Sequence, residues 1–88
     1  MFENECRILY IKTYDFTDEK SGKNVKGANV SYIWTKPSDK ENEKGFRVMF
    51  GKLPYDVAMN LMNDLPCDIV GKFELSSNNE LKLVDIAN

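Results

Sequence analysis

The stretch from residue 20 to residue 52 combines positive charge with aromatic side chains. It contains eight Lys or Arg residues and three acids, in a chain whose formal net charge is −2. Aromatic residues lie in or beside the same stretch: Tyr14, Phe16, Tyr32, Trp34, Phe46 and Phe50. Single-stranded nucleic acids are bound by cations that neutralise phosphates and by flat rings that stack on bases. The stretch is therefore typical of such a binding surface, on a domain that is otherwise acidic.

On this interpretation, nine residues are candidates for contact with a nucleic acid. Lysines and one arginine would neutralise phosphates, and three aromatic rings would stack on bases. The candidate site is Tyr14, Lys20, Lys23, Lys26, Tyr32, Trp34, Lys36, Arg47 and Lys52. Each type also has a structural alternative, because lysines solubilise loops, and Tyr32 and Trp34 can fill the core. Tyr10 shares a strand face with Lys12 and Tyr14, and that face is expected to be partly wet because lysine is rarely buried.

The residue types that catalysis needs are largely missing from this chain. It has no histidine, and so it lacks the commonest general base and metal ligand. Cys6 and Cys67 do not make a zinc ligand set. The Gly-Lys pairs at 22–23 and 51–52 lack the spacing of a phosphate-binding loop. We therefore predict a protein that is not an enzyme, with no catalytic residues, no metal site and no cofactor.

Length and composition are those of one small globular domain. The 88 residues are 42% hydrophobic and 11% aromatic, which excludes a disordered chain. No apolar run approaches the roughly 20 residues of a membrane span, and the acidic N-terminus does not resemble an export signal. In such a chain, the two distant cysteines are expected to be reduced thiols, and a disulfide between them is the alternative. These features predict a single cytoplasmic domain over residues 1–88, with no membrane contact.

The period of the apolar side chains predicts five strands. They span residues 6–16, 28–35, 46–53, 68–75 and 80–86. A polar, glycine-bearing loop joins the first two strands at 17–27, and a charged loop opened by Pro37 spans 36–45. Strict alternation in the first strand puts one set of side chains on a common face: Ile8, Tyr10, Lys12, Tyr14 and Phe16.

A change of period after Pro54 predicts one short helix. An apolar stripe at helical spacing is formed by Val57, Ala58, Leu61, Met62 and Leu65. Asp56 lies in the first turn, where the helix dipole favours an acid, and Pro66 prevents continuation past the stripe. The expected order is β-β-β-α-β-β, a mainly β domain with its helix between the third and fourth strands.

Length, strand order and a long Gly- and Lys-bearing first hairpin at 21–27 together suggest a family. The chain resembles the small single-domain OB-fold proteins that bind single-stranded DNA in phages and mobile elements, the filamentous-phage gene V class among them. The resemblance implies an α+β small barrel, a five-stranded Greek-key fold whose first hairpin, strands two and three, and last hairpin shape the binding cleft. The last hairpin at 76–80 departs from this pattern, because it contains no base and is followed only by Lys82. The resemblance is also compatible with a homodimer.

Two functions from different classes follow. The first is a non-catalytic protein that binds single-stranded DNA, in preference to RNA, with low sequence specificity. It would act in replication or transfer of a phage, plasmid or conjugative element. The alternative is a small protein-binding adaptor or inhibitor on the same barrel with no nucleic-acid activity. It would dock through the acids of its C-terminal half: Asp56, Asp64, Asp68, Glu74, Glu80 and Asp85.

Overall fold

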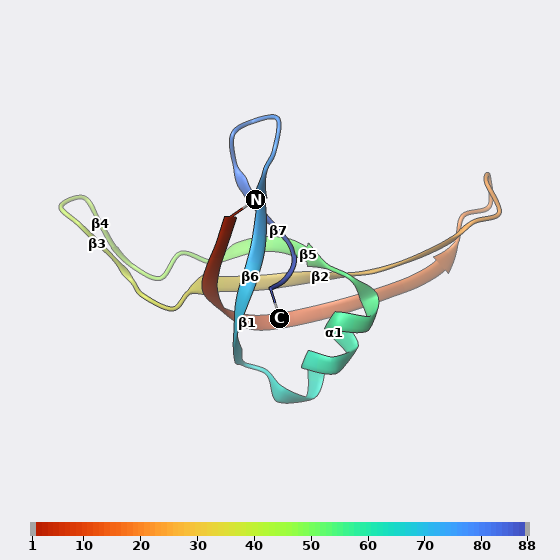
Figure 1. Ribbon diagram of the computed structural model, residues 1–88, viewed down its shortest axis with the longest axis horizontal. Helices are drawn as coiled ribbons and strands as arrows, with labels where there is room; N and C mark the ends of the chain where they lie inside the picture. The colour runs from red at the N-terminus through yellow and green to blue at the C-terminus, as the bar shows by residue number, and fades with distance from the viewer. Residues whose placement is uncertain (1, 88) are drawn as a thin grey trace.

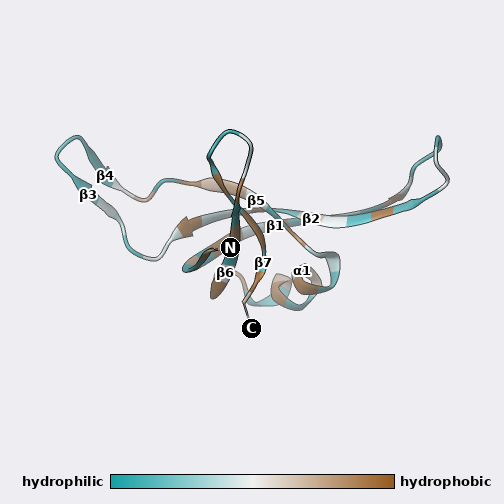
Figure 2. Cartoon of the chain, turned by 45° about the horizontal axis from the view of Figure 1, so that its top comes forward, coloured by the Kyte–Doolittle hydropathy of each residue, from teal (hydrophilic) through white to brown (hydrophobic). Residues whose placement is uncertain are grey.

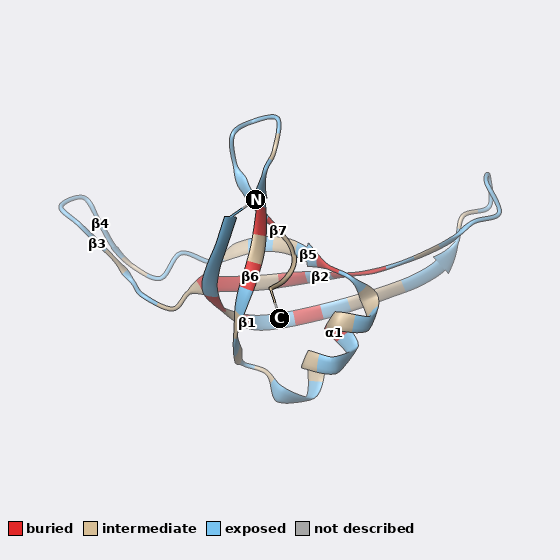
Figure 3. Cartoon of the chain, viewed as in Figure 1, coloured by how far each residue is buried: buried red, intermediate tan, exposed pale blue. Residues whose placement is uncertain are grey.

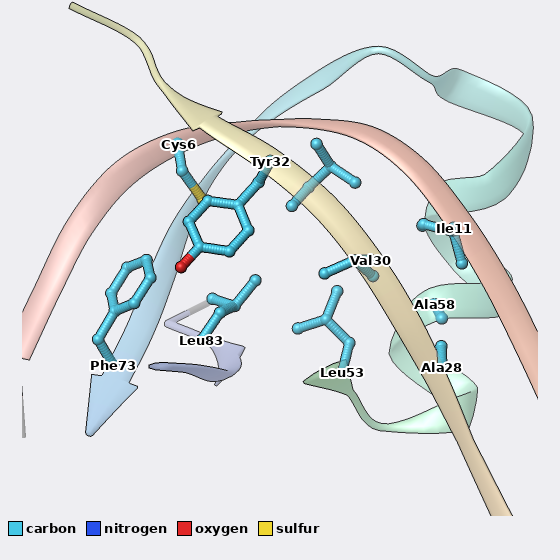
Figure 4. Packing of buried hydrophobic residues seen from close by; sticks show 10 residues of the cluster. Cys6, Ile11, Ala28, Val30, Tyr32, Leu53, Ala58, Phe73 and Leu83 are labelled. Atoms are coloured by element: carbon cyan, nitrogen blue, oxygen red, sulfur yellow. The ribbon is translucent and has the colours of Figure 1, made fainter. Parts of the chain in front are cut away.

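The structure is a computed structural model that describes residues 2–87. Five strands form one antiparallel sheet in the order β5-β2-β1-β6-β7, and β3 and β4 form a separate hairpin. The sheet is curled into a half-barrel (Figures 1 and 4), and the mainly β class with one short helix is confirmed. In chain order the elements are β1 Phe2–Thr17, β2 Asn24–Trp34, β3 Ser38–Lys40, β4 Glu43–Gly45, β5 Met49–Leu53, α1 Tyr55–Leu61, the 3-10 turn η1 Met62–Asp64, β6 Cys67–Leu75 and β7 Leu81–Ile86.

The curl brings the two edge strands of the sheet, β5 and β7, side by side. The approach is close at Gly51, where an added Cβ would lie 2.9 Å from the Cβ of Leu83. A glycine in a strand commonly marks such a close approach of another chain segment. Within residues 2–87, β5 and β7 are not hydrogen-bonded neighbours, so the half-barrel has an open seam between them.

The hydrophobic core fills the inner face of the curled sheet (Figure 4). Alternate residues of β2, namely Ala28, Val30 and Tyr32, point into it, as the alternation predicted. Ala58 of α1 is buried against the sheet, and the rest of the predicted helical stripe packs around the cluster. The buried cluster is Cys6, Ile8, Ile11, Ala28, Val30, Tyr32, Leu53, Ala58, Phe73 and Leu83. Figure 3 shows that burial is concentrated at the centre of the sheet and is absent from the projecting hairpins.

A bulge in β1 corrects the predicted face of that strand. Ile8 pairs with Tyr32, but Tyr10 pairs with Ser31, so one extra β1 residue is inserted at this point. Such an insertion reverses which residues face inward. Ile8 is consequently buried in the core while Tyr10 and its alternate neighbours face outward, and the prediction that Ile8 shares their face is wrong.

The β1–β2 and β3–β4 hairpins extend toward opposite ends of the long axis and make the molecule elongated (Figure 1). Its principal extents are 51 × 32 × 21 Å, and its Cα radius of gyration is 14.5 Å. A compact domain of this length would have a radius of about 12 Å. The ends of both hairpins are largely hydrophilic (Figure 2), so they add surface without adding core.

The projecting hairpins also change the predicted loops. β1 and β2 extend further than expected, which reduces the predicted loop at 17–27 to a tip at 18–23. Near this tip the Asn24 side-chain amide donates to Asp15 Oδ1 at 2.9 Å. The predicted charged loop at 36–45 contains the short β3–β4 hairpin, and the third predicted strand begins only at Met49.

Burial protects one of the two free cysteines. Cys6 is fully buried in the core, and Cys67 is half-buried on the adjacent strand β6. Desolvation by burial raises the pKa of the Cys6 thiol to about 11, with smaller contributions from the neighbouring Asp68 and Cys67. The protonated thiol is therefore the form that the fold favours.

We expect Cys6 to resist iodoacetamide in the folded protein near pH ~8, because the thiolate is the reactive form. The folded-state pKa of about 11 exceeds the ordinary thiol value of 9.0. This group should therefore stabilise the fold fully below pH 9.0 and lose that contribution as the pH rises toward about 11. Alkylation followed by mass spectrometry, in buffer and in urea, checks the first expectation, and unfolding at increasing pH checks the second. Equal alkylation rates of Cys6 in buffer and in urea would contradict the expected protection of this thiol by the fold.

Candidate functional site

The outer face of the sheet carries a groove with a volume of about 590 Å³. Its floor is β2, whose outward side chains here are small or polar, and larger side chains on β1 and β5 rise on either side. The groove extends past β5 to β7, whose Lys82, Leu83 and Val84 also line it. The lining residues are Tyr10, Asn29, Val30, Ser31, Phe50, Gly51, Lys52, Lys82, Leu83 and Val84. We call this feature the outer groove.

The strand register arranges the outer groove into two transverse rows. Tyr10 of β1 pairs with Ser31 of β2, and Ser31 pairs with Phe50 of β5. Directly opposed residues of antiparallel strands point to the same face, so two rings flank one small hydroxyl side chain. We call Tyr10, Ser31 and Phe50 the aromatic row. Two residues further along each strand, Asn29 of β2 pairs with Lys12 of β1 and with Lys52 of β5. We call these three residues the lysine row.

Both rings of the aromatic row are accessible to a ligand. Phe50 is 76% exposed and Tyr10 is 55% exposed. The apolar surface continues next to Phe50, because Val48 and Phe46 are also about half exposed. Clustered exposed rings on a small protein mark a binding surface more often than a single exposed residue does.

Lysines outnumber acids at the outer groove. Lys52 and Lys82 line it, and Lys12 stands beside the lining on β1. One acid, Glu74, lies opposite Lys82 across the β6–β7 pair. The three ion pairs found within residues 2–87 involve Arg7, Lys40 and Lys44, all outside the outer groove. Asp15, the only acid of β1 between Tyr10 and Phe16, pairs with Lys26 and faces the opposite side of the strand. Lys12, Lys52 and Lys82 therefore act together on one face of the sheet.

Only part of the site predicted from the sequence belongs to this groove. Lys52 lines it. Tyr14 lies on the same outer face, one alternate position beyond Lys12, and its ring covers the backbone at Gly27. A Cβ at residue 27 would collide with this ring, which explains why glycine occupies the position.

The other predicted cations are dispersed over the molecule. Lys20 and Lys23 lie at the exposed tip of the β1–β2 hairpin. The Lys26 ammonium lies 5.3 Å from the centroid of the Tyr55 ring, on the face opposite to the groove. Lys36 and Arg47 are exposed residues that flank the β3–β4 hairpin. The fold does not bring these five residues together.

Two predicted stacking residues belong to the core instead. Tyr32 is 1% exposed. Its ring and that of Trp34 contact each other edge-on, and the Trp34 ring packs edge-on against Phe73 with centroids 5.1 Å apart. The prediction that Tyr32 stacks on a base is therefore wrong in this structure, because the apolar period of β2 serves the core. Trp34 is half-buried and points to the same inner face.

Sequence reasoning did not assign Tyr10, Lys12, Phe50 or Lys82 to the site. A local signal existed, because an aromatic residue and a lysine alternate at Tyr10 and Lys12 and again at Phe50 and Lys52. An aromatic residue that alternates with a lysine is typical of a strand face that is exposed to solvent and available to a ligand. The meeting of the two pairs across β2 depends on the sheet register, which joins segments 40 residues apart.

A second hollow lies at the free end of the β6–β7 hairpin. It has a volume of about 700 Å³ and is lined by Phe2, Phe73, Glu74, Leu75 and Leu81. The lining contains one acid and no base, so this hollow does not suit a polyanion.

Comparison with protein-family models, with curated proteins and with solved structures finds no match for this chain. In the part of the chain that the structure describes, no three or more His, Cys, Asp or Glu side chains are grouped so as to hold a metal ion. Over the same residues, no helix has the length and apolar character needed to cross a membrane. The chemistry of the outer groove is therefore the basis for the functional conclusion.

Proposed function

We propose that the protein binds single-stranded nucleic acid, with DNA as the favoured form, along the outer groove. Tyr10 and Phe50 would stack on bases, while Lys12, Lys52 and Lys82 neutralise phosphates. The observation that supports this most strongly is the juxtaposition of two exposed rings with Lys12 and Lys52 on one face of the sheet. Neither lysine forms an ion pair within residues 2–87. A polyanion with flat, partly apolar side groups complements both properties at once.

The strand arrangement supports the further proposal that the half-barrel is an OB-fold. Its strand order places the two edge strands next to each other, and α1 follows the third strand of the five-stranded sheet in the chain. OB-folds bind oligonucleotides on the face of their second and third strands, between the first and last hairpins. In this chain those two strands are β2 and β5, which form the floor and one wall of the outer groove.

Low sequence specificity fits the kinds of contact that the groove offers. Stacking accepts any base, and phosphate contacts carry no sequence information. A non-catalytic, stoichiometric role in replication or transfer of a phage, plasmid or conjugative element is the biological setting that the resemblance implies. The homodimer stays a prediction.

A fluorescence-anisotropy titration with labelled oligo-dT of about 16 nucleotides, an upper site size for such folds, tests the proposal. We expect saturable binding that weakens between about 50 and 200 mM salt, with a log–log slope of about −2 if three lysines each neutralise one phosphate. Duplex DNA of equal length is the control and should bind more weakly. Absence of binding to oligo-dT at the lower salt concentration would exclude the proposal. A label on the DNA is preferable to tryptophan fluorescence, because Trp34 reports on the core.

The protein-binding adaptor has less support, because the acids of the C-terminal half do not form one acidic surface. Arg7 donates two hydrogen bonds to the Asp68 carboxylate, at 2.7 and 3.1 Å, and these hold the pKa of Asp68 below its usual value. Glu74 lies directly opposite Lys82 across the β6–β7 pair. A pull-down after nuclease treatment that still retained a protein partner would favour the adaptor.

A further inference from the structure

The dimensions of the aromatic row match a flat ring held on both faces. Tyr10 and Phe50 stand two strands apart on either side of Ser31, which puts their Cα atoms about 9.5 Å apart. Two rings that sandwich a third need about 7–8 Å between them, since aromatic carbons pack best at about 3.5–4.0 Å. A small inward lean of the two side chains gives this spacing. The hydroxymethyl group of Ser31 is short enough to leave the space between the rings open.

The exposure of the two rings agrees with a ligand that covers both of them. Each is more than half exposed, and both line the same groove. The core is filled from the other face of the sheet, so neither ring contributes to the buried cluster. An inserted planar ring would remove the inner faces of Tyr10 and Phe50 from water simultaneously, which a ligand lying across the top of the groove would not do.

The lysine row supplies charge at a matching position. It lies one alternate residue along the strands, about 6.8 Å from the aromatic row. At this level Lys52 lines the groove on one side of Asn29, and Lys12 stands on the other side of Asn29, next to the lining. Two cations on opposite sides of Asn29 can neutralise one phosphate, while the adjacent row holds the base of the same nucleotide.

We propose that the outer groove contains a subsite for one unpaired nucleotide, with its base sandwiched between Tyr10 and Phe50 above Ser31 and its phosphate held between Lys12 and Lys52. This inference rests on the proposed function and adds to it the unit that is recognised. A base in duplex DNA has both faces occupied by its stacked neighbours, so it cannot enter the slot. The subsite therefore selects single strands by shape, without reading the sequence.

A double-mutant cycle tests whether both rings contact the same base. Tyr10→Leu and Phe50→Leu keep apolar side chains on exposed positions, and each should lower the affinity for oligo-dT about 5- to 150-fold. Once one ring is lost, the other cannot complete the sandwich, so the double variant should lose at least about threefold less than the product of the single losses. The matched control pairs Tyr10→Leu with Phe46→Leu, because Phe46 is exposed but lies outside the groove lining. In this control pair, the loss of affinity of the double variant should equal the product of the two single losses.

An abasic oligonucleotide separates the two proposals. The wild-type protein should still bind it in a salt-dependent way, and neither leucine variant should change that affinity, since no base is present to stack. If the wild-type protein binds oligo-dT but the Tyr10 and Phe50 effects multiply, the slot is wrong and the proposed function stands. If both effects are absent, the slot and the outer groove are both wrong as the binding site, and only nucleic-acid binding itself stands. If the wild-type protein binds no oligonucleotide at low salt, both are wrong.

Discussion

Replacing Lys12 and Lys52 together by glutamate is expected to lower the affinity for oligo-dT on the order of 100-fold at about 50 mM salt. Each substitution removes a cation of the lysine row, Lys52 from the groove lining and Lys12 from the position beside it, and puts a carboxylate where a phosphate would lie. The log–log salt slope should become shallower by about 1.4, because two phosphate contacts are lost. Anisotropy titrations at several salt concentrations measure both quantities.

The matched control is Lys40→Glu with Lys44→Glu on the β3–β4 hairpin. It changes the net charge by the same amount, at residues that form exposed ion pairs away from the groove. Measured at the higher salt concentration of about 200 mM, where screening acts within about 8 Å, its effect on affinity should stay within about threefold. An equal loss in the control would show that binding follows net charge and that the outer groove has no special role.

The tip of the β1–β2 hairpin offers a competing location for the phosphates. Lys20 and Lys23 were candidates in the sequence and lie at the exposed tip, outside the groove lining. Lys20→Glu with Lys23→Glu should therefore weaken oligo-dT binding less than the lysine-row variant does. The opposite ranking would place the nucleic acid on the hairpin tip instead of in the groove.

Local periodicity predicted the elements that pack against the core. Ala28, Val30 and Tyr32 alternate as a half-buried strand requires, and the helical stripe around Ala58 faces the sheet as expected. The bulge beside Ile8 could not be predicted, because it depends on how β1 pairs with β2. The β3–β4 hairpin was also hidden, since its strands are three residues each and consist mainly of charged residues.

The candidate site was harder to predict because charge density along the chain differs from charge density in space. Lysines between residues 20 and 52 are close in sequence, but the two projecting hairpins separate them. The lysines that face one another, Lys12 and Lys52, are 40 residues apart and meet only through their common partner Asn29. The alternation of Tyr32 and Trp34 on β2 was likewise ambiguous. Aromatic residues alternate in the same way on a strand that faces the core and on a strand that stacks on bases.

Replacing Phe73 by alanine is expected to lower the free energy of unfolding by about 3–5 kcal/mol. The ring is 0% exposed, and its centroid lies 5.1 Å from Trp34 and 5.8 Å from Tyr32. Small domains have about 5–15 kcal/mol in total, so the variant should be close to unfolding. Urea unfolding followed by Trp34 fluorescence measures the loss, and the milder Phe73→Leu gives a graded value if the alanine variant does not fold.

Phe50→Ala is the matched substitution on the opposite face of the same sheet. Because Phe50 is 76% exposed, its removal should change the free energy of unfolding by no more than about 0.5 kcal/mol. The same variant should bind oligo-dT about 5- to 150-fold more weakly, since one stacking ring is lost. A large destabilisation by Phe50→Ala would mean that the ring supports the fold and that its exposure is no sign of a ligand. A stable variant with unchanged affinity would remove Phe50 from the binding surface. Loss of affinity without loss of stability is expected only if the inner face of the sheet holds the fold together while the outer face binds the nucleic acid.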